Sequence, residues 1–160
     1  LMILVLLGTQ NNSFHRLLEE IQKNIDDGNI KEKVVVQAGY TKFESKDMTI
    51  YNQLPKEQLQ EFIKEADLII THGGVGSIIS SITNGKKVIA VPRLQKYKEH
   101  VNDHQLDIIN SFNESGYIIG IHGVEELKEA LKKVPDFEPK KYVQNTGNII
   151  KIIKDFIDNN

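Results

Sequence analysis

The order of hydrophobic and polar residues predicts short buried strands that alternate with amphipathic helices. The expected strands are apolar runs rich in Val and Ile, at Met2–Leu7, Lys33–Ala38, Met48–Tyr51, Asp67–Thr71, Lys87–Pro92 and Tyr117–Gly120. Segments with helical spacing lie between them, at Ser13–Asp26, Pro55–Glu65, Val75–Thr83, Val101–Phe112 and Val124–Lys133. Continuous apolar strands are typical of a parallel sheet that is covered on both faces. The pattern predicts an α/β fold with a doubly wound parallel sheet of about six strands.

Local signals support the predicted helices. Val75, Ile78, Ile79 and Ile82 follow the i, i+3, i+4, i+7 spacing of a single apolar stripe. Other signals mark helix ends, because proline suits a first helical turn and glycine suits the left-handed residue that follows a last turn. These residues are Pro55, Gly28 and Gly85. Together they favour a Rossmann-like arrangement of strands and helices.

The pattern changes after Lys133, which divides the chain into residues 1–133 and 134–160. Val134–Lys141 contains Pro135 and Pro139 and is expected to be an extended connector. The final segment predicts a helix with a wide apolar face, formed by Ile149, Ile150, Ile152, Ile153, Phe156 and Ile157. We expect this helix to pack on the domain or on a partner.

Composition narrows the possible functions. The 160 residues carry 20 Lys plus Arg and 22 Asp plus Glu, a formal net charge of −2, which argues against a nucleic-acid binder held by a broad basic field. The absence of cysteine excludes disulfide scaffolds, zinc–thiolate sites and thiol catalysis. The apolar run Leu1–Leu7 is too short for a signal sequence or a membrane span. A cytoplasmic location is therefore expected.

The segment Thr71–Ser77, Thr-His-Gly-Gly-Val-Gly-Ser, joins a predicted strand to a predicted helix. Open α/β sheets bind ligands at the carboxyl ends of their strands. The N–H groups of Gly74 to Ser77 and the positive end of the helix would hold a diphosphate there. The segment lacks the Lys-Ser/Thr pair of a P-loop, and Ile79 replaces the third glycine of a dinucleotide fingerprint. A tight turn with a helix cap is the alternative interpretation.

Two further segments are expected at the same edge of the sheet. Arg93–Gln105 contains Asp103, His104 and Gln105, whose side chains can hydrogen-bond sugar hydroxyls. Taken alone, the residues of this segment slightly favour the alternative, a solvated basic loop followed by the first turn of a helix. Gly8–Phe14 begins with Gly8, Thr9 and Gln10 and is polar and turn-forming. A helix-capping loop is its alternative interpretation.

Three motifs in order resemble the C-terminal domain of glycosyltransferase family 28. They are Ile-Ile-Thr-His-Gly-Gly-Val-Gly-Ser (69–77), Gly-Lys-Lys-Val-Ile-Ala-Val-Pro-Arg (85–93) and Glu-His-Val-Asn-Asp-His-Gln (99–105). The opening Leu-Val-Leu-Leu-Gly-Thr-Gln (4–10) is similar to that domain's first strand and loop. Within the family, the chain resembles stand-alone halves. These are exopolysaccharide transferase subunits of the PssE type and the catalytic subunit of the eukaryotic dolichol-linked N-acetylglucosaminyltransferase.

The resemblance implies the C-terminal half of a GT-B fold, which binds a UDP-sugar. By position, Gly74, Gly76 and Ser77 would contact the diphosphate. Gly8, Thr9 and Gln10, which follow the first predicted strand, would face the same cleft. Asp103, His104 and Gln105 would face the donor sugar, with His72 and Arg93 lining the cleft. MurG-like members hold the ribose with a Glu where this chain has Ser80.

The resemblance further implies that a membrane-anchored, acceptor-binding subunit completes the enzyme. The expected reaction is inverting transfer of a sugar from UDP to a lipid-linked saccharide in exopolysaccharide or capsule synthesis. Neither a metal nor a cofactor is expected. The chain would lie at the inner face of the membrane through its partner. A general base must deprotonate the acceptor, and the candidates are His15 and His72.

Two other functions are compatible with the same residues. A non-catalytic module would bind a nucleotide-sugar without turnover. A hydrolase would use Ser77 with His72 or His104, although Ser77 is not in a Gly-x-Ser-x-Gly elbow.

Overall fold

The structure is a computed structural model that describes residues 1–142. The helix predicted from Ile149 to Ile157 lies outside the described residues. The strands are β1 (Met2–Leu6), β2 (Lys33–Gln37), β3 (Met48–Tyr51), β4 (Leu68–His72), β5 (Lys87–Val91) and β6 (Ile119–Gly120). The α-helices are α1 (His15–Asp26), α2 (Lys56–Glu65), α3 (Val75–Thr83), α4 (His104–Glu114) and α5 (Leu127–Lys133). Short 3-10 turns cover Gln95–Tyr97, Val124–Glu126 and Val134–Asp136.

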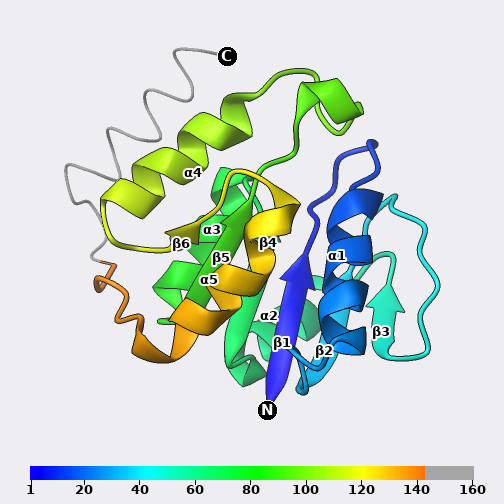
Figure 1. Ribbon diagram of the computed structural model, residues 1–160, viewed down its shortest axis with the longest axis horizontal. Helices are drawn as coiled ribbons and strands as arrows, with labels where there is room; N and C mark the ends of the chain where they lie inside the picture. Colours follow the sequence, from blue (N-terminus) through cyan, green and yellow to red (C-terminus); the bar gives the residue numbers. More distant parts are fainter. Residues whose placement is uncertain (143–160) are drawn as a thin grey trace.

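All six strands form one parallel sheet, in the order β3-β2-β1-β4-β5-β6 (Figure 1). The chain builds outward from β1 to β3 and then returns to place β4 on the other side of β1. This order is that of a Rossmann fold, and the prediction of a doubly wound sheet is confirmed. The point where the strand order reverses lies between β1 and β4, so a ligand site is expected at the carboxyl ends of these strands.

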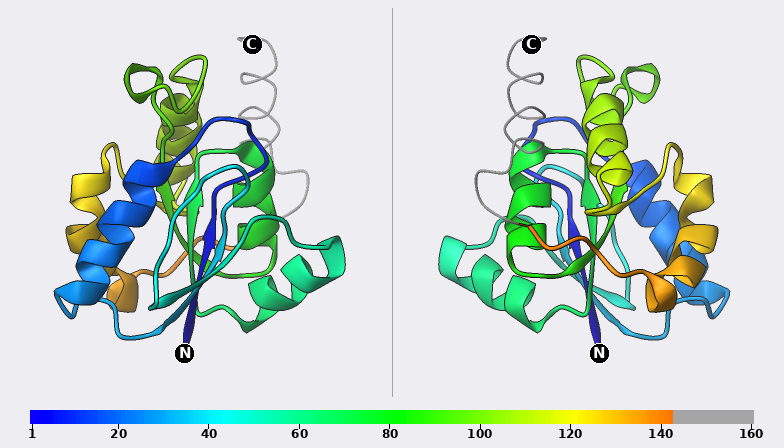
Figure 2. Two further views of the ribbon diagram at one scale, coloured as in Figure 1. Left: turned by 90° about the vertical axis from the view of Figure 1, so that its right-hand side faces the viewer. Right: turned by 90° about the vertical axis from the view of Figure 1, so that its left-hand side faces the viewer.

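Helices cover both faces of the sheet, as Figure 2 shows from its two sides. Alternate residues of β1 point to opposite faces, because the side-chain period of a strand is two. Ile3 and Val5 pack in one core with α1 and α5, and Leu4 and Leu6 pack in the other with α2, α3 and α4. Burial on both faces explains why the strands are continuous apolar runs.

The start of α4 differs from the predicted boundary by three residues. The sequence predicts a helix from Val101, whereas α4 begins at His104 with Asp103 as its N-cap residue. Val101 is 77% exposed and contributes nothing to the core. The preceding loop makes its own 3-10 turn and then passes through Lys98, whose φ is +59°. A non-glycine residue rarely adopts this left-handed conformation, and it ends the turn before a helix can start.

The described part of the predicted connector packs against the domain. The Lys140 N–H donates to the Gly116 carbonyl over 2.9 Å. Phe137 joins the core below α1 and α5, and Tyr142 packs edge-on against Tyr117. Residues 134–136 form a 3-10 turn instead of extended chain. Among residues 1–142, no helix has the length and apolar character that crossing a bilayer requires.

Candidate functional site

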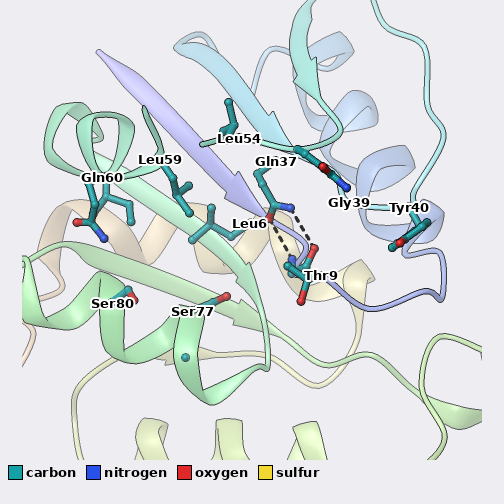
Figure 3. A pocket seen from close by; sticks show the side chains of 14 residues that line it. Leu6, Thr9, Gln37, Gly39, Tyr40, Leu54, Leu59, Gln60, Ser77 and Ser80 are labelled. Carbon is teal, nitrogen blue, oxygen red and sulfur yellow. Dashed lines mark hydrogen bonds between the residues drawn. The ribbon is translucent and has the colours of Figure 1, made fainter. Parts of the chain in front are cut away.

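A cleft of about 450 Å³ lies at the carboxyl edge of the sheet, where the strand order reverses (Figure 3). Its walls come from the ends of β1 and β2, the loop before α2, one side of α2 and the start of α3. The residues that line it are Leu6, Gly8, Thr9, Gln37, Gly39, Tyr40, Gln53, Leu54, Leu59, Gln60, Ile63, Gly76, Ser77 and Ser80. This is the position at which a doubly wound sheet is expected to hold a ligand.

The N-terminus of α3 opens onto this cleft. Gly74 is the N-cap residue, and no side chain within residues 1–142 caps the helix. The first N–H groups of a helix have no partner in a preceding turn, and they form the positive end of its dipole. A Cβ atom added to Gly76 would meet nothing within 4 Å, so the helix surface there is bare. The start of α3 therefore offers unshielded N–H donors to an anion in the cleft.

His72 lies beneath this helix start and is only 5% exposed. Its ring is held between two glycines. A Cβ atom on Gly8 would come within 2.5 Å of His72 Nε2, and one on Gly74 would also overlap the ring. Gly8 in addition has a φ of +80°, which disfavours any other residue. These two glycines are required because the backbone passes directly against the imidazole.

Gln105 and Ser77 hydrogen-bond opposite sides of the His72 ring. Gln105 Nε2 lies 3.1 Å from His72 Nδ1, and His72 Nε2 lies 3.3 Å from Ser77 Oγ. The Gln105 carbonyl oxygen accepts the N–H groups of Gly73 and Arg93, over 2.9 Å and 3.0 Å. A single glutamine from α4 thus joins the loop after β4 to the end of β5.

Burial, and to a smaller extent the positive charge of Arg93, lower the pKa of His72 to about 3. A base this weak cannot accept a proton from a hydroxyl near neutral pH. The lowered pKa and the burial of the ring argue against His72 as a general base, a role that stays a prediction. They also disfavour a hydrolase that relies on the Ser77–His72 pair.

The lowered pKa predicts a pH-dependent stability. Between the folded pKa of about 3 and the ordinary value of 6.5, the unfolded chain binds more protons at His72 than the folded chain does. The free energy of unfolding should therefore fall as the pH drops below 6.5, by up to about 1.4 kcal/mol per pH unit, with no contribution from His72 above that range. Urea unfolding from about pH 7 to about pH 5 measures the slope.

The matched variant is His72→Gln, which cannot titrate. We expect a shallower slope for it, whatever its stability near neutral pH. Burial also lowers the pKa of His100, so part of the slope should remain in both proteins. Equal slopes in the two proteins would contradict the buried, neutral state of His72.

Arg93 is the largest fully buried side chain. Its guanidinium donates to the carbonyl oxygens of Leu7, Asn12 and Glu99. Burial lowers the pKa of Arg93 to about 10 against the opposing effect of the Glu99 carboxylate, so the group stays charged at neutral pH. Glu99 in turn binds Arg16 of α1 through two hydrogen bonds of 3.0 Å. We call Arg16, Arg93 and Glu99 the loop anchor, because they tie the loop after β1 to the loop after β5.

The predicted site residues fall into three groups. Those that line the cleft are Gly8, Thr9, Gly76 and Ser77. Those buried beneath it, where they hold its walls instead of facing a ligand, are His72, Arg93 and Gln105. Those at the same edge of the sheet but outside the cleft lining are Gln10, Gly74, Asp103 and His104.

The hydrogen bonds of Arg93 and Gln105 are made within the protein, so a role of either side chain in holding a ligand stays a prediction. The Arg93 guanidinium donates to backbone carbonyls, and the Gln105 amide bonds two backbone N–H groups and the His72 ring. Asp103 is likewise engaged, since its Oδ1 accepts the Gln95 N–H over 2.8 Å. His15, the other candidate base, is exposed on α1, where it contacts Glu19 and the Lys42 carbonyl. It is not among the residues that line the cleft.

Several cleft residues were not predicted. Gln37 ends β2, and its amide makes two hydrogen bonds with the backbone of Gly8, of 3.1 Å and 3.0 Å (Figure 3). Gly39 and Tyr40 follow directly, and the Tyr40 side chain is 57% exposed. A polar residue at the end of an apolar strand, followed by glycine, was the available signal. Gln60 carries no such signal, because it reaches the cleft only through the packing of α2.

Comparison with known proteins identifies relatives. The chain is 35% identical over 83 residues to UDP-N-acetylglucosamine transferase subunit ALG13 of Kluyveromyces lactis, which covers 51% of this chain and 40% of the relative. It is 29% identical over 76 residues to the human protein of that name, a match that covers 48% of this chain and 6% of the human protein. A third relative is a UDP-N-acetylglucosamine–N-acetylmuramyl-(pentapeptide) pyrophosphoryl-undecaprenol N-acetylglucosamine transferase of Clostridium tetani. The two are 25% identical over 158 residues, and the match covers 93% of this chain and 40% of the relative. The chain thus spans less than half the length of these relatives.

Solved structures share the fold. An NMR structure of ALG13 superposes with a TM-score of 0.62 at 16% identity, covering 95% of this chain and 94% of that one. A crystal structure of the glycotransferase of kitacinnamycin gives a TM-score of 0.57 at 15% identity, and the match covers 98% of this chain and 39% of that one. The model of the glycosyltransferase family 28 C-terminal domain matches residues 2–159. The chain therefore belongs to glycosyltransferase family 28, as a C-terminal domain of that family.

Proposed function

We propose that this chain binds the UDP-sugar donor of an inverting glycosyltransferase and that a second, acceptor-binding domain or subunit completes the active site. The observation that carries the proposal is the start of α3, which opens uncapped onto the cleft at the carboxyl edge of the sheet. The family membership supports glycosyl transfer as the reaction.

The diphosphate would lie against the first turn of α3. Its oxygens would accept the N–H groups at Gly76 and Ser77 and the Ser77 hydroxyl. Fixed donors at this point stabilise the negative charge that grows on UDP as the bond to the sugar breaks. The helix dipole adds to this stabilisation because the first turn is its positive end.

The nucleoside would extend from the diphosphate toward α2. Ser80 lies one turn after Ser77, and Gln60 of α2 lies on the facing wall (Figure 3). These two polar side chains could hold the ribose hydroxyls where MurG-like members use a Glu. Leu54 and Leu59 continue the same wall with apolar surface that fits a flat base.

The acceptor and the general base would come from the other side of the cleft. Transfer forms a bond from the acceptor oxygen to the anomeric carbon, breaks the bond from that carbon to UDP, and passes the acceptor proton to a base. Neither His72 nor His15 is placed for this task. We propose that the partner supplies the base and brings the lipid-linked acceptor, which would hold the chain at the cytoplasmic face of a membrane.

The relatives favour N-acetylglucosamine as the sugar. The names of the yeast, human and clostridial relatives all contain UDP-N-acetylglucosamine, and the clostridial name specifies an undecaprenol-linked acceptor. We therefore propose UDP-N-acetylglucosamine as the donor and a polyprenyl-diphosphate saccharide as the acceptor. The exopolysaccharide context expected from the sequence receives no support from these names and stays a prediction.

Calorimetric titration with UDP, UMP and uridine tests the proposed site on the chain alone. We expect UDP to bind at least about tenfold more tightly than UMP, because each charge-assisted hydrogen bond to the second phosphate contributes at that level. Uridine should bind more weakly still. Equal affinities for the three compounds would show that α3 does not hold a diphosphate.

A transfer assay decides between the enzyme and the non-catalytic module. Labelled UDP-N-acetylglucosamine and a polyprenyl-diphosphate saccharide are incubated with the chain, with the candidate partner, and with both. Transfer only in the mixture supports a split enzyme, and transfer by the chain alone contradicts it. UDP binding without transfer in any mixture would favour the module.

A further inference from the structure

The orientation of the Gln105 amide is fixed by the backbone. Its Oε1 faces the N–H groups of Gly73 and Arg93, at 2.9 Å and 3.0 Å. A backbone N–H can only donate, so the atom that faces both groups must be the carbonyl oxygen. The NH₂ group of Gln105 must then point at His72 Nδ1, 3.1 Å away. This assignment does not depend on the usual ambiguity between oxygen and nitrogen in an amide.

The amide in turn fixes the tautomer of His72. An NH₂ group can only donate, so His72 Nδ1 must accept and cannot carry a proton. The proton of the neutral ring therefore lies on Nε2. An imidazolium would place two donors face to face at Nδ1, and a ring turned over would lose the hydrogen bond between Nδ1 and Gln105.

The tautomer then fixes the direction of the Ser77 hydroxyl. His72 Nε2–H points at Ser77 Oγ over 3.3 Å, so the hydroxyl oxygen accepts from the ring. Its own hydrogen cannot point back at that nitrogen. Ser77 lines the cleft, so its hydroxyl oxygen lies where a ligand in the cleft could accept this hydrogen (Figure 3).

We infer that Gln105 and His72 are positioning residues, a relay that makes Ser77 a fixed hydrogen-bond donor to the diphosphate of the bound nucleotide. The inference rests on the proposed function, because the diphosphate is the acceptor it names. The relay would preorganise the site, because a Ser77 hydroxyl whose hydrogen is already turned away from His72 Nε2 need not leave that nitrogen when the ligand binds. The same relay prevents Ser77 from acting as a nucleophile, since His72 Nε2 has no free lone pair to take its proton.

NMR of the ¹⁵N-labelled chain without ligand measures directly which ring nitrogen of His72 carries the proton. Long-range ¹H–¹⁵N correlation distinguishes a protonated from an unprotonated ring nitrogen. For His72 we expect an unprotonated Nδ1 and a protonated Nε2 at neutral pH. A proton on Nδ1 in the wild-type chain would overturn the inference, whatever the nucleotide affinity is.

Gln105→Glu is the diagnostic variant. A carboxylate still accepts from Gly73 and Arg93, but it replaces the donor at His72 Nδ1 by an acceptor. The proton should move to Nδ1, Nε2 should become an acceptor, and the Ser77 hydroxyl should turn toward the ring. We expect UDP affinity to fall about tenfold, as for the loss of one charge-assisted hydrogen bond.

A double-mutant cycle with Ser77→Ala separates the relay from a general effect of the new charge. If Gln105 acts through the Ser77 hydroxyl, Gln105→Glu should have little further effect on UDP affinity in the Ser77→Ala background. An equal loss in both backgrounds would overturn the relay. The wild-type chain could show the expected tautomer but no UDP affinity. The proposed function would then be wrong, and so would the diphosphate as the acceptor for Ser77. The hydrogen bonds from Gln105 to His72 and from His72 to Ser77 would still be supported.

Discussion

Replacing Gly76 by leucine should abolish nucleotide binding and leave the fold intact. The position is exposed at the second residue of α3, and a Cβ atom there meets nothing within 4 Å, so the side chain would extend into the cleft. We expect UDP affinity to fall by about 100-fold or more, because the leucine would occupy the volume that the diphosphate needs. Calorimetry with UDP measures the loss.

Although Gly76→Leu should weaken UDP binding, it should raise the free energy of unfolding. Leucine is a better helix former than glycine by about 0.5–1 kcal/mol, so the Gly76→Leu chain should unfold at slightly higher urea concentration. Thr83→Leu, at the exposed far end of the same helix, is the matched control and should bind UDP normally. Gly76→Leu binding that equals the wild type would place the nucleotide away from α3.

Of the variants discussed, Arg93→Met should lower the free energy of unfolding the most. The variant keeps a long side chain but leaves the carbonyl oxygens of Leu7, Asn12 and Glu99 without their buried donor. The Glu99 carboxylate, itself 3% exposed, would lose a neighbouring positive charge. Removing one partner of a buried ionic cluster typically costs about 3–5 kcal/mol. Equilibrium unfolding in urea measures the difference.

Two further variants test the cause. Arg93→Lys retains the charge but not the planar fork, so it should recover only part of the loss. Lys96→Ala removes an exposed charge from the same loop and should change stability by less than about 0.5 kcal/mol. If Arg93→Met lost less than about 1 kcal/mol, the loop anchor would not be a structural element of the cleft.

The sheet was predictable from the sequence because its strands are buried on both faces. Val34, Val35 and Val36 are all buried, and such a run has few interpretations besides a parallel strand. The start of α4 was less predictable. Val101 fits a helical apolar stripe, yet its burial depends on a loop conformation that the residue itself does not determine.

The cleft was predictable only in part. Gly76 and Ser77 follow a strand and open a helix, and this local context is enough to place them at the carboxyl edge. The roles of Arg93 and Gln105 depend on distant contacts instead. Arg93 bonds the carbonyls of Asn12 and Leu7, which are 81 and 86 residues away in sequence. A polar residue near a strand end can face the ligand or support the wall, and only the packing decides between the two.

The loop anchor also makes the shape of the loop after β1 depend on that of the loop after β5. Arg93 cannot be buried until the segments around Asn12 and Glu99 have both closed over it, so these loops take their shape as the core forms. If the cleft binds a nucleotide as proposed, that nucleotide would meet a loop after β1 that the anchor already holds. Less conformational entropy would then be lost on binding, which would favour binding of a flexible diphosphate by this chain before a second domain or subunit arrives.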